Sequence, residues 1–124
     1  MFDHVCLEVS DFEKSKLFYI PIMKFLGFKV WVEGDDHIGF GTNERTHFWL
    51  NQTAHDSATK NVHIAFPSQT REDVNEFYKI ALKSGGISEG APGLRPEYHK
   101  DYYGAFVLDP DGNNIEAVCH KHFL

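Results

Sequence analysis

The hydrophobic and polar positions in the first part of the chain predict one strand followed by one helix. Apolar and polar residues alternate through Phe2–Val9, as is typical of a strand with one buried face. An apolar stripe at helical spacing follows and ends at Gly27; it consists of Phe18, Ile22, Phe25 and Leu26. Ser10 and Glu13 form a capping box that begins this helix, and Pro21 predicts a kink or an early end.

Three short apolar segments bounded by turn residues predict three more strands. They are Phe28–Glu33, His37–Gly41 and Thr46–Asn51. Glycine, aspartate and asparagine gather in the two intervals between them, as turns require. The first part of the chain is therefore expected to form one strand, one helix and three strands.

The same order of elements then begins again. A strand at Asn61–Phe66 precedes a helix that Thr70 and Asp73 open and that Gly85 and Gly86 close. One separation, 59 residues, recurs at the strand, the helix and the closing glycine: it joins His4 to His63, Phe18 to Phe77 and Gly27 to Gly86. A constant separation through three elements indicates an internal repeat.

The chain closes with a predicted hairpin. The turn Asp109–Gly112 (DPDG) lies between the apolar runs Tyr102–Leu108 and Ile115–Cys119. Alternation in the second run separates Glu116 from its apolar neighbours, so that a carboxylate points away from the helix-covered face. A Pro/Gly-rich insertion, Ala91–Asp101, precedes the hairpin and is expected to be a loop.

These elements predict an α+β fold in a single domain, residues 1–124, built from two βαβββ modules at about residues 1–52 and 61–122. Each module would form a four-stranded sheet with its helix on the outer face. We expect the two sheets to form a curved mixed sheet around a metal-bearing cavity, within one chain or across two. The uncovered faces would line it with His4, Cys6, Glu8, His63, Ala65, Glu116 and Val118.

Composition and charge narrow the possible partners. A hydrophobic content of 42% with 15% aromatic residues indicates a packed core rather than disorder. The formal charge of −6 argues against nucleic acid or an anionic membrane as a partner. No apolar run reaches the ~20 residues of a membrane span, and no signal peptide is apparent, so we expect a cytoplasmic protein.

Two imidazoles and one carboxylate are predicted to face the cavity: His4, His63 and Glu116. Each histidine by itself would more often be a core residue with its hydrogen bonds satisfied. Three such residues at repeat-related positions instead favour a site for one divalent metal ion with open coordination positions. Ligand type does not distinguish zinc, iron, manganese and nickel here.

Three segments of the chain resemble the vicinal oxygen chelate superfamily, which includes glyoxalase I, bleomycin- and fosfomycin-resistance proteins and extradiol dioxygenases. They are FDHVCLEVSD, NVHIAF and DPDGNNIEAV, and the resemblance extends over nearly the whole chain. It implies paired βαβββ modules that are often completed across a dimer interface, so we expect a homodimer. It also implies that His4, His63 and Glu116 are the metal ligands.

Two positions depart from the pattern of glyoxalase I. Trp49 stands where the resemblance places a fourth ligand, usually glutamate, and tryptophan cannot bind a metal. Glu8 stands where glyoxalase I carries an arginine for a glutathione carboxylate, and its charge would repel that group. The resemblance therefore implies a glyoxalase-related branch with three protein ligands and an unassigned substrate rather than lactoylglutathione.

Other side chains could act beside the metal. Glu8 could be a general base, or a solvated or salt-bridged carboxylate. Arg95, Tyr98 and His99 of the insertion could bind an anionic or carbonyl-bearing substrate, with Tyr103 as a catalytic group; the alternative is a surface loop whose tyrosines pack on the sheet edge.

Trp49 and the C-terminal histidines could have structural rather than functional roles. Trp49 would be either a substrate-binding wall of the cavity or a core residue. His120 and His122 follow in the tail, where we expect fraying or contact with a second copy.

We therefore expect a divalent-metal-dependent, glyoxalase-related enzyme that chelates oxygens of a small-molecule substrate. Its reaction would be that of a lyase, an isomerase or a thiol transferase. Two alternatives stay open: a binding protein of the bleomycin-resistance type that sequesters a drug-like molecule, and an extradiol-type dioxygenase.

Overall fold

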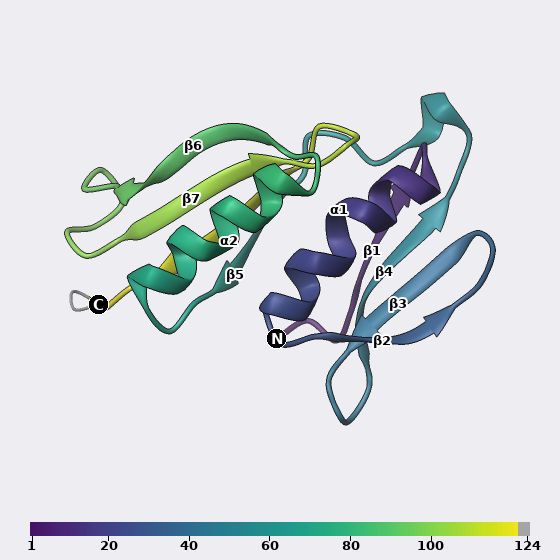
Figure 1. Cartoon of the computed structure of the whole chain (residues 1–124), viewed down its shortest axis with the longest axis horizontal. Coiled ribbons are helices and arrows are strands. Elements are labelled where there is room, and N and C mark those ends of the chain that lie inside the picture. The colour runs from purple at the N-terminus through teal and green to yellow at the C-terminus, as the bar shows by residue number, and fades with distance from the viewer. Residues whose placement is uncertain (122–124) are drawn as a thin grey trace.

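Two four-stranded sheets, each covered on one face by a helix, form the structure, a computed structural model that describes residues 1–121 (Figure 1). The first module comprises β1 (Val5–Val9), α1 (Phe12–Phe25), β2 (Lys29–Glu33), β3 (His37–Gly41) and β4 (Thr46–Gln52). A short 3-10 helix, η1 (His55–Ser57), leads to the second module. It comprises β5 (His63–Pro67), α2 (Arg71–Lys83), β6 (Ile87–Leu94), β7 (Tyr103–Leu108) and β8 (Asn114–Cys119).

The two sheets have the same topology. Their strand orders are β1-β4-β3-β2 and β5-β8-β7-β6, and in each the first and last strands of the module pair in parallel. The remaining pairs are antiparallel. This equivalence confirms the predicted α+β fold of two βαβββ modules.

The two modules share one hydrophobic core. Their helices pack against each other on the same side of the molecule (Figure 1). Phe18 of α1 lies so close to Gly86 of the second module that a Cβ on this glycine would be 2.7 Å from the phenyl ring. The core contains fully buried side chains from both helices, including Tyr19, Ile22, Val74 and Phe77.

The helix ends agree with the sequence prediction in α2 but differ in α1. Thr70 caps α2 by accepting a hydrogen bond from the backbone N–H of Asp73, as predicted. In α1 the capping residue is Asp11, because the Ser10 hydroxyl donates instead to Asp111 of the second module. The predicted capping box of Ser10 and Glu13 is therefore wrong.

Pro21 does not end α1, which continues to Phe25. A proline removes one intrahelical hydrogen bond, and here the carbonyl that loses it belongs to Leu17, whose side chain is 72% exposed. Water can reach this side of the helix. The buried stripe of α1 then holds the following turn in place.

Several strand boundaries differ from the prediction, and the differences at the first strand and at β6 bear on the predicted site. The first strand begins at Val5, so that His4 precedes it rather than lying within it. Strand β6 extends to Leu94 and includes part of the segment that was expected to be a loop. Its register shifts twice, near Gly90 and Gly93, which lets a Pro/Gly-rich stretch pair with β7. The predicted second module ends at His122, which lies outside the described residues.

The faces that were predicted to line a cavity are open at β1 and β5 in the single chain, whereas Glu116 and Val118 of β8 are buried. Cys6 and Glu8 of β1 are exposed, and so are His63 and Ala65 of β5. Among residues 1–121, no strand of one sheet pairs with a strand of the other. No helix in this range combines the length and the apolar character that a membrane crossing requires.

Candidate functional site

Glu116 is a carboxylate buried inside the second sheet. It lies on β8 between β5 and β7, and its side chain is fully buried. Its Oε1 lies 2.7 Å from Nε2 of His63, and its Oε2 accepts a hydrogen bond from the hydroxyl of Tyr102. A buried carboxylate is costly without such donors, so these two contacts explain how the sheet tolerates it.

His63 reaches Glu116 from the beginning of the neighbouring strand. Strands β5 and β8 run parallel, with Ala65 in register with Glu116. The imidazole packs edge-on against Phe106, with ring centroids 5.9 Å apart. Half of the His63 side chain remains exposed, so the imidazole is held on one side and open to solvent on the other.

These two side chains fit one part of a divalent-metal site. An imidazole nitrogen and a carboxylate oxygen are common ligands of zinc, iron, manganese and nickel. An ionised carboxylate only accepts hydrogen bonds, so the 2.7 Å contact between Oε1 and Nε2 fits an imidazole that carries a proton on Nε2. A bound cation would take the place of that proton between Oε1 and Nε2. The chemistry of these two atoms therefore fits a divalent metal ion.

The third predicted ligand is not brought to this point. His4 belongs to the first module, is exposed, and has its Nδ1 2.8 Å from Oδ1 of Asp3. Within residues 1–121 no three side chains of histidine, cysteine, aspartate or glutamate gather as a metal site. The structure thus joins His63 to Glu116 and leaves His4 apart in the single chain.

Tyr102, which the sequence analysis did not single out, takes the place expected for Tyr103. The Tyr103 hydroxyl points to the helix side, where it lies 2.7 Å from Oδ1 of Asn75 on α2. Consecutive residues at a strand point to opposite faces, so Tyr102 faces Glu116 instead. Tyr102 lies an even number of residues before Phe106, which is in register with Glu116, so the alternation of the strand could have identified Tyr102 from the sequence.

The Tyr102 hydroxyl remains a hydrogen-bond donor at ordinary pH. Burial raises its pKa well above the usual value, and the hydrogen bond to Glu116 raises the pKa further. The positive charge of Arg95 opposes this rise, which also places that guanidinium in the neighbourhood of Tyr102.

Aromatic and imidazole rings surround Tyr102. The ring centroids of Tyr98, His99 and His120 lie 4.9, 5.5 and 5.4 Å from that of Tyr102. Nε2 of His99 is 2.9 Å from Nδ1 of His120, which joins the loop before β7 to the end of β8. The predicted substrate-binding residues Tyr98 and His99 are thus at the site, together with His120, which was expected to fray or to contact a second copy.

Arg95 covers the outer side of the same region. Its guanidinium stacks 5.1 Å from the centroid of Phe106, the ring that also contacts His63. Its Nη2 donates to the carbonyl of Ala91 at 2.7 Å. No carboxylate within the described residues forms an ion pair with it, so Arg95 retains a positive charge that an anionic ligand could use.

The two remaining predicted residues lie in the first module, on the sheet that does not contain Glu116. The backbone of Glu8 is bonded to Thr59, and its side chain is exposed. Trp49 of β4 lies over Gly39, where a Cβ would be 2.8 Å from the indole ring. Trp49 is partly exposed, on the face that also carries Cys6, and it is not among the buried core residues.

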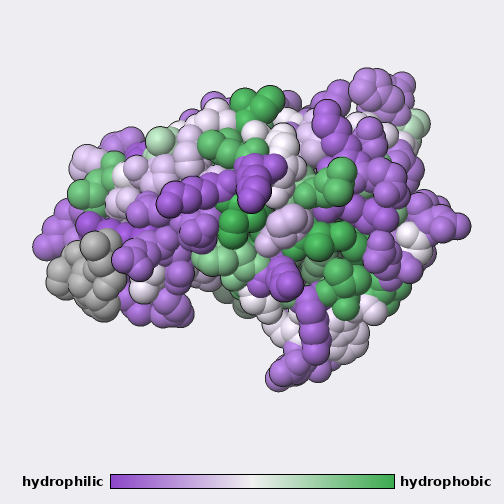
Figure 2. Space-filling model, in the orientation of Figure 1, coloured by the Kyte–Doolittle hydropathy of each residue, from purple (hydrophilic) through white to green (hydrophobic). Residues whose placement is uncertain are grey.

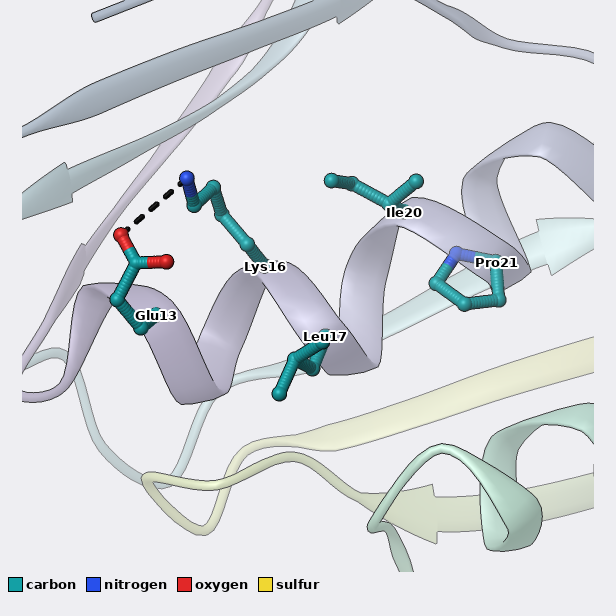
Figure 3. A pocket seen from close by; sticks show the side chains of 5 residues that line it. All are labelled: Glu13, Lys16, Leu17, Ile20 and Pro21. Carbon is teal, nitrogen blue, oxygen red and sulfur yellow. Dashed lines mark ion pairs between the residues drawn. The ribbon is translucent and has the colours of Figure 1, made fainter. Parts of the chain in front are cut away.

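The helix side of the molecule has pockets whose lining residues differ from those around Glu116. One of about 260 Å³ is lined by residues of α1 alone, with an ion pair between Lys16 and Glu13 at 3.2 Å (Figure 3). Hydrophobic residues are visible among hydrophilic ones on this face (Figure 2). The hollow contains no histidine and no aromatic side chain, and it is not part of the His63–Glu116 site.

Solved structures share the fold over nearly the whole chain. A glyoxalase/bleomycin resistance protein from Albidiferax ferrireducens T118 is 28% identical, with a TM-score of 0.81 over 96% of this chain and 98% of that one. A glyoxalase/bleomycin resistance protein/dioxygenase family enzyme from Burkholderia phytofirmans PsJN is 20% identical, with a TM-score of 0.74 over 96% and 98% of the two chains.

A lactoylglutathione lyase from Agrobacterium tumefaciens is 15% identical, with a TM-score of 0.69 over 96% of this chain and 92% of that one. At this identity the likeness concerns the fold alone. Comparison with curated protein sequences found no match.

A family model matches residues 1–117, a range that includes the whole first module and Glu116. The chain therefore belongs to the Glyoxalase/Bleomycin resistance protein/Dioxygenase superfamily.

Proposed function

We propose that the protein is a divalent-metal-dependent, glyoxalase-related enzyme that binds oxygens of a small substrate and acts as a lyase, an isomerase or a thiol transferase. The observation that carries this proposal is the fully buried Glu116 with its carboxylate 2.7 Å from the imidazole of His63. Burying a carboxylate in the sheet reduces the stability of the fold, and a role in binding a ligand accounts for the presence of this residue.

The site would be completed across a homodimer. His63 and Glu116 supply two ligands, and His4 of a second copy would supply the third. The exposed faces of β1 and β5, which carry Cys6, Glu8 and Ala65, would then be covered by the partner. A two-fold dimer would form two equivalent sites, each with one part from either copy.

When bound, a divalent ion at His4, His63 and Glu116 would polarise substrate oxygens and stabilise developing negative charge. The chain's own residues would do the rest. Arg95 would orient an anionic group of the substrate, and Tyr98 and His99 would line the opening beside it. Glu8 and Trp49 lie on the same module as His4, where Glu8 would accept a proton and Trp49 would form an apolar wall.

Lactoylglutathione is not the proposed substrate. The exposed carboxylate of Glu8 would repel the carboxylates of glutathione if it faced the shared site. A smaller substrate with a single anionic group is compatible with the positive charge of Arg95 and with the aromatic rings around Tyr102.

Metal content tests the proposal directly. Protein purified without chelator should contain about one ion per chain by elemental analysis, as one three-ligand site per chain implies. His63→Ala, Glu116→Gln and His4→Ala should each lose the ion. His55→Ala is a control, because His55 is exposed in η1 between the two modules and its loss should leave the metal content unchanged. Retention of the ion by His63→Ala would show that the ligand assignment is wrong.

A second candidate function is that of a non-catalytic binder for a small aromatic molecule. The cluster of rings at Tyr98, Tyr102 and Phe106 beside the Arg95 guanidinium favours it. Such a binder would retain its ligand affinity after Glu116→Gln, whereas the proposed enzyme would lose metal and turnover together. Oxygen uptake with catechols after loading with Fe²⁺ would instead indicate a dioxygenase.

A further inference from the structure

The two carboxylate oxygens of Glu116 contact different side chains, and this arrangement suggests a role for Tyr102. Oε1 faces His63, and Oε2 accepts the hydroxyl hydrogen of Tyr102. The hydrogen bond to Oε2 occupies one of its lone pairs and fixes the orientation of the carboxylate, which favours Oε1 as the oxygen that meets a cation on the His63 side. Resting on the proposed function, we infer that Tyr102 is a positioning residue that holds Oε2 of Glu116 and makes the carboxylate a single-oxygen ligand on the His63 side.

Tyr102 is itself held by the chain. Its backbone N–H donates to the carbonyl of His99 at 3.2 Å, and its carbonyl accepts from the backbone N–H of Arg95 at 2.8 Å. The rings of Tyr98, His99 and His120 then pack around its phenol. Contacts on several sides restrict the phenol to one position, as a residue that orients a ligand requires.

Gly104 provides the space for this contact. A Cβ at Gly104 would lie 3.0 Å from Oε2 of Glu116 and 3.2 Å from Cε1 of Tyr102. Any side chain there would press on both partners of the hydrogen bond. The absence of a side chain at this position is therefore part of the same arrangement, and it is an observation independent of the hydroxyl contact.

The adjacent tyrosines allow a matched test. Tyr102→Phe removes the hydroxyl that holds Glu116, whereas Tyr103→Phe removes a hydroxyl bonded to Asn75 on the helix side. Affinity for Zn²⁺ would be measured on the purified full chain by competition with a chromophoric chelator. Tyr102→Phe should bind Zn²⁺ roughly 10- to 100-fold more weakly, as loss of a partner of a metal ligand does. Tyr103→Phe should bind like the wild type.

A second variant approaches the same contact without removing the hydroxyl. Gly104→Ala adds a methyl group against Oε2 and should weaken Zn²⁺ binding in the same direction. Wild-type affinity in both Tyr102→Phe and Gly104→Ala, with loss of binding in Glu116→Gln, would overturn the positioning role while leaving the proposed function intact.

Crystal structures of the metal-free wild type and Tyr102→Phe test the positioning of Glu116 separately from the proposed function, which is rejected only if the wild type binds none of Zn²⁺, Fe²⁺, Mn²⁺ and Ni²⁺. We expect the Glu116 carboxylate to rotate or to occupy more than one position once the hydroxyl is gone. An unchanged carboxylate in Tyr102→Phe would overturn the inference, because another contact would then be sufficient to hold Glu116.

Discussion

The hydroxyl of Tyr19 on α1 donates a hydrogen bond to Oδ2 of Asp109 at 2.5 Å, across a separation of 90 residues. Asp109 begins the turn between β7 and β8, and its Oδ1 accepts from the backbone N–H groups of Asp111 and Asn113, both at 2.9 Å. Ser10 adds a second link by bonding to Asp111. The first helix of one module is thus joined to the last turn of the other.

Removing the Tyr19 hydroxyl should destabilise the whole chain. Tyr19→Phe leaves the phenyl ring in the core but deprives a buried carboxylate of a donor, which typically costs about 1–3 kcal/mol. The free energy of unfolding in urea would measure the loss. Tyr78→Phe is the matched control, because its hydroxyl bonds to Ser88 in an exposed position and its loss should have little effect.

The same contact predicts a pH dependence on the alkaline side. Burial, and then the charge of Asp109, raise the pKa of Tyr19 above that of an unfolded tyrosine, which is about 10. A group whose pKa is raised by folding contributes fully below its unfolded pKa and loses its contribution as the pH rises above it. The difference in unfolding free energy between wild type and Tyr19→Phe should therefore be constant from about pH 7 to 9 and decrease above about pH 10.

An unchanged difference up to pH 11 would contradict this assignment. Tyr102 also has a raised pKa, so the wild type alone would not isolate Tyr19. The comparison with Tyr19→Phe removes that contribution, since Tyr102 is present in both proteins.

Mixing two variants that each fail to bind metal should restore metal binding if the site is shared between two copies of the chain. His4→Ala and His63→Ala each lack one ligand, but a mixed dimer has one site with both defects and one with none. Random exchange should therefore return about a quarter of the wild-type metal content, since half of the dimers are mixed and half of their sites are intact.

No recovery after exchange would indicate a site formed within one chain, provided that size-exclusion chromatography of differently tagged variants shows mixed dimers. A mixture of His63→Ala with Glu116→Gln is the matched control. Both defects then lie on the same module, so no intact site can form.

Gly39→Ala should displace Trp49. The added Cβ would be 2.8 Å from the indole, and the ring can move away from this clash because Trp49 is partly exposed. In a Trp31→Phe background, where Trp49 is the remaining tryptophan of the two, its fluorescence emission should shift to the red as the ring becomes more exposed. Unchanged emission would show that the ring does not cover Gly39 in solution.

Local pattern was sufficient to predict most of the architecture. The strand periods, the Thr70 cap and the turn beginning at Asp109 all involve residues close together in sequence, and each is present in the structure. The repeat of one spacing likewise corresponds to two modules with the same topology. Such features follow from backbone geometry and side-chain alternation, which a single sequence expresses directly.

The contacts between modules could not be predicted in the same way. Ser10 has the local pattern of a helix cap, but its hydroxyl bonds to Asp111, and Asp11 caps the helix instead. His63 and Glu116 meet because β5 and β8 pair, whereas the place of His4 relative to them depends on how two separate sheets are arranged.

Sequence alone therefore determined which side chains share a face within each sheet, and tertiary structure decided which of them meet. The physical reason is that periodicity describes one element at a time. The packing of the two helices against each other depends on many weak contacts between distant residues, and no local pattern encodes their sum.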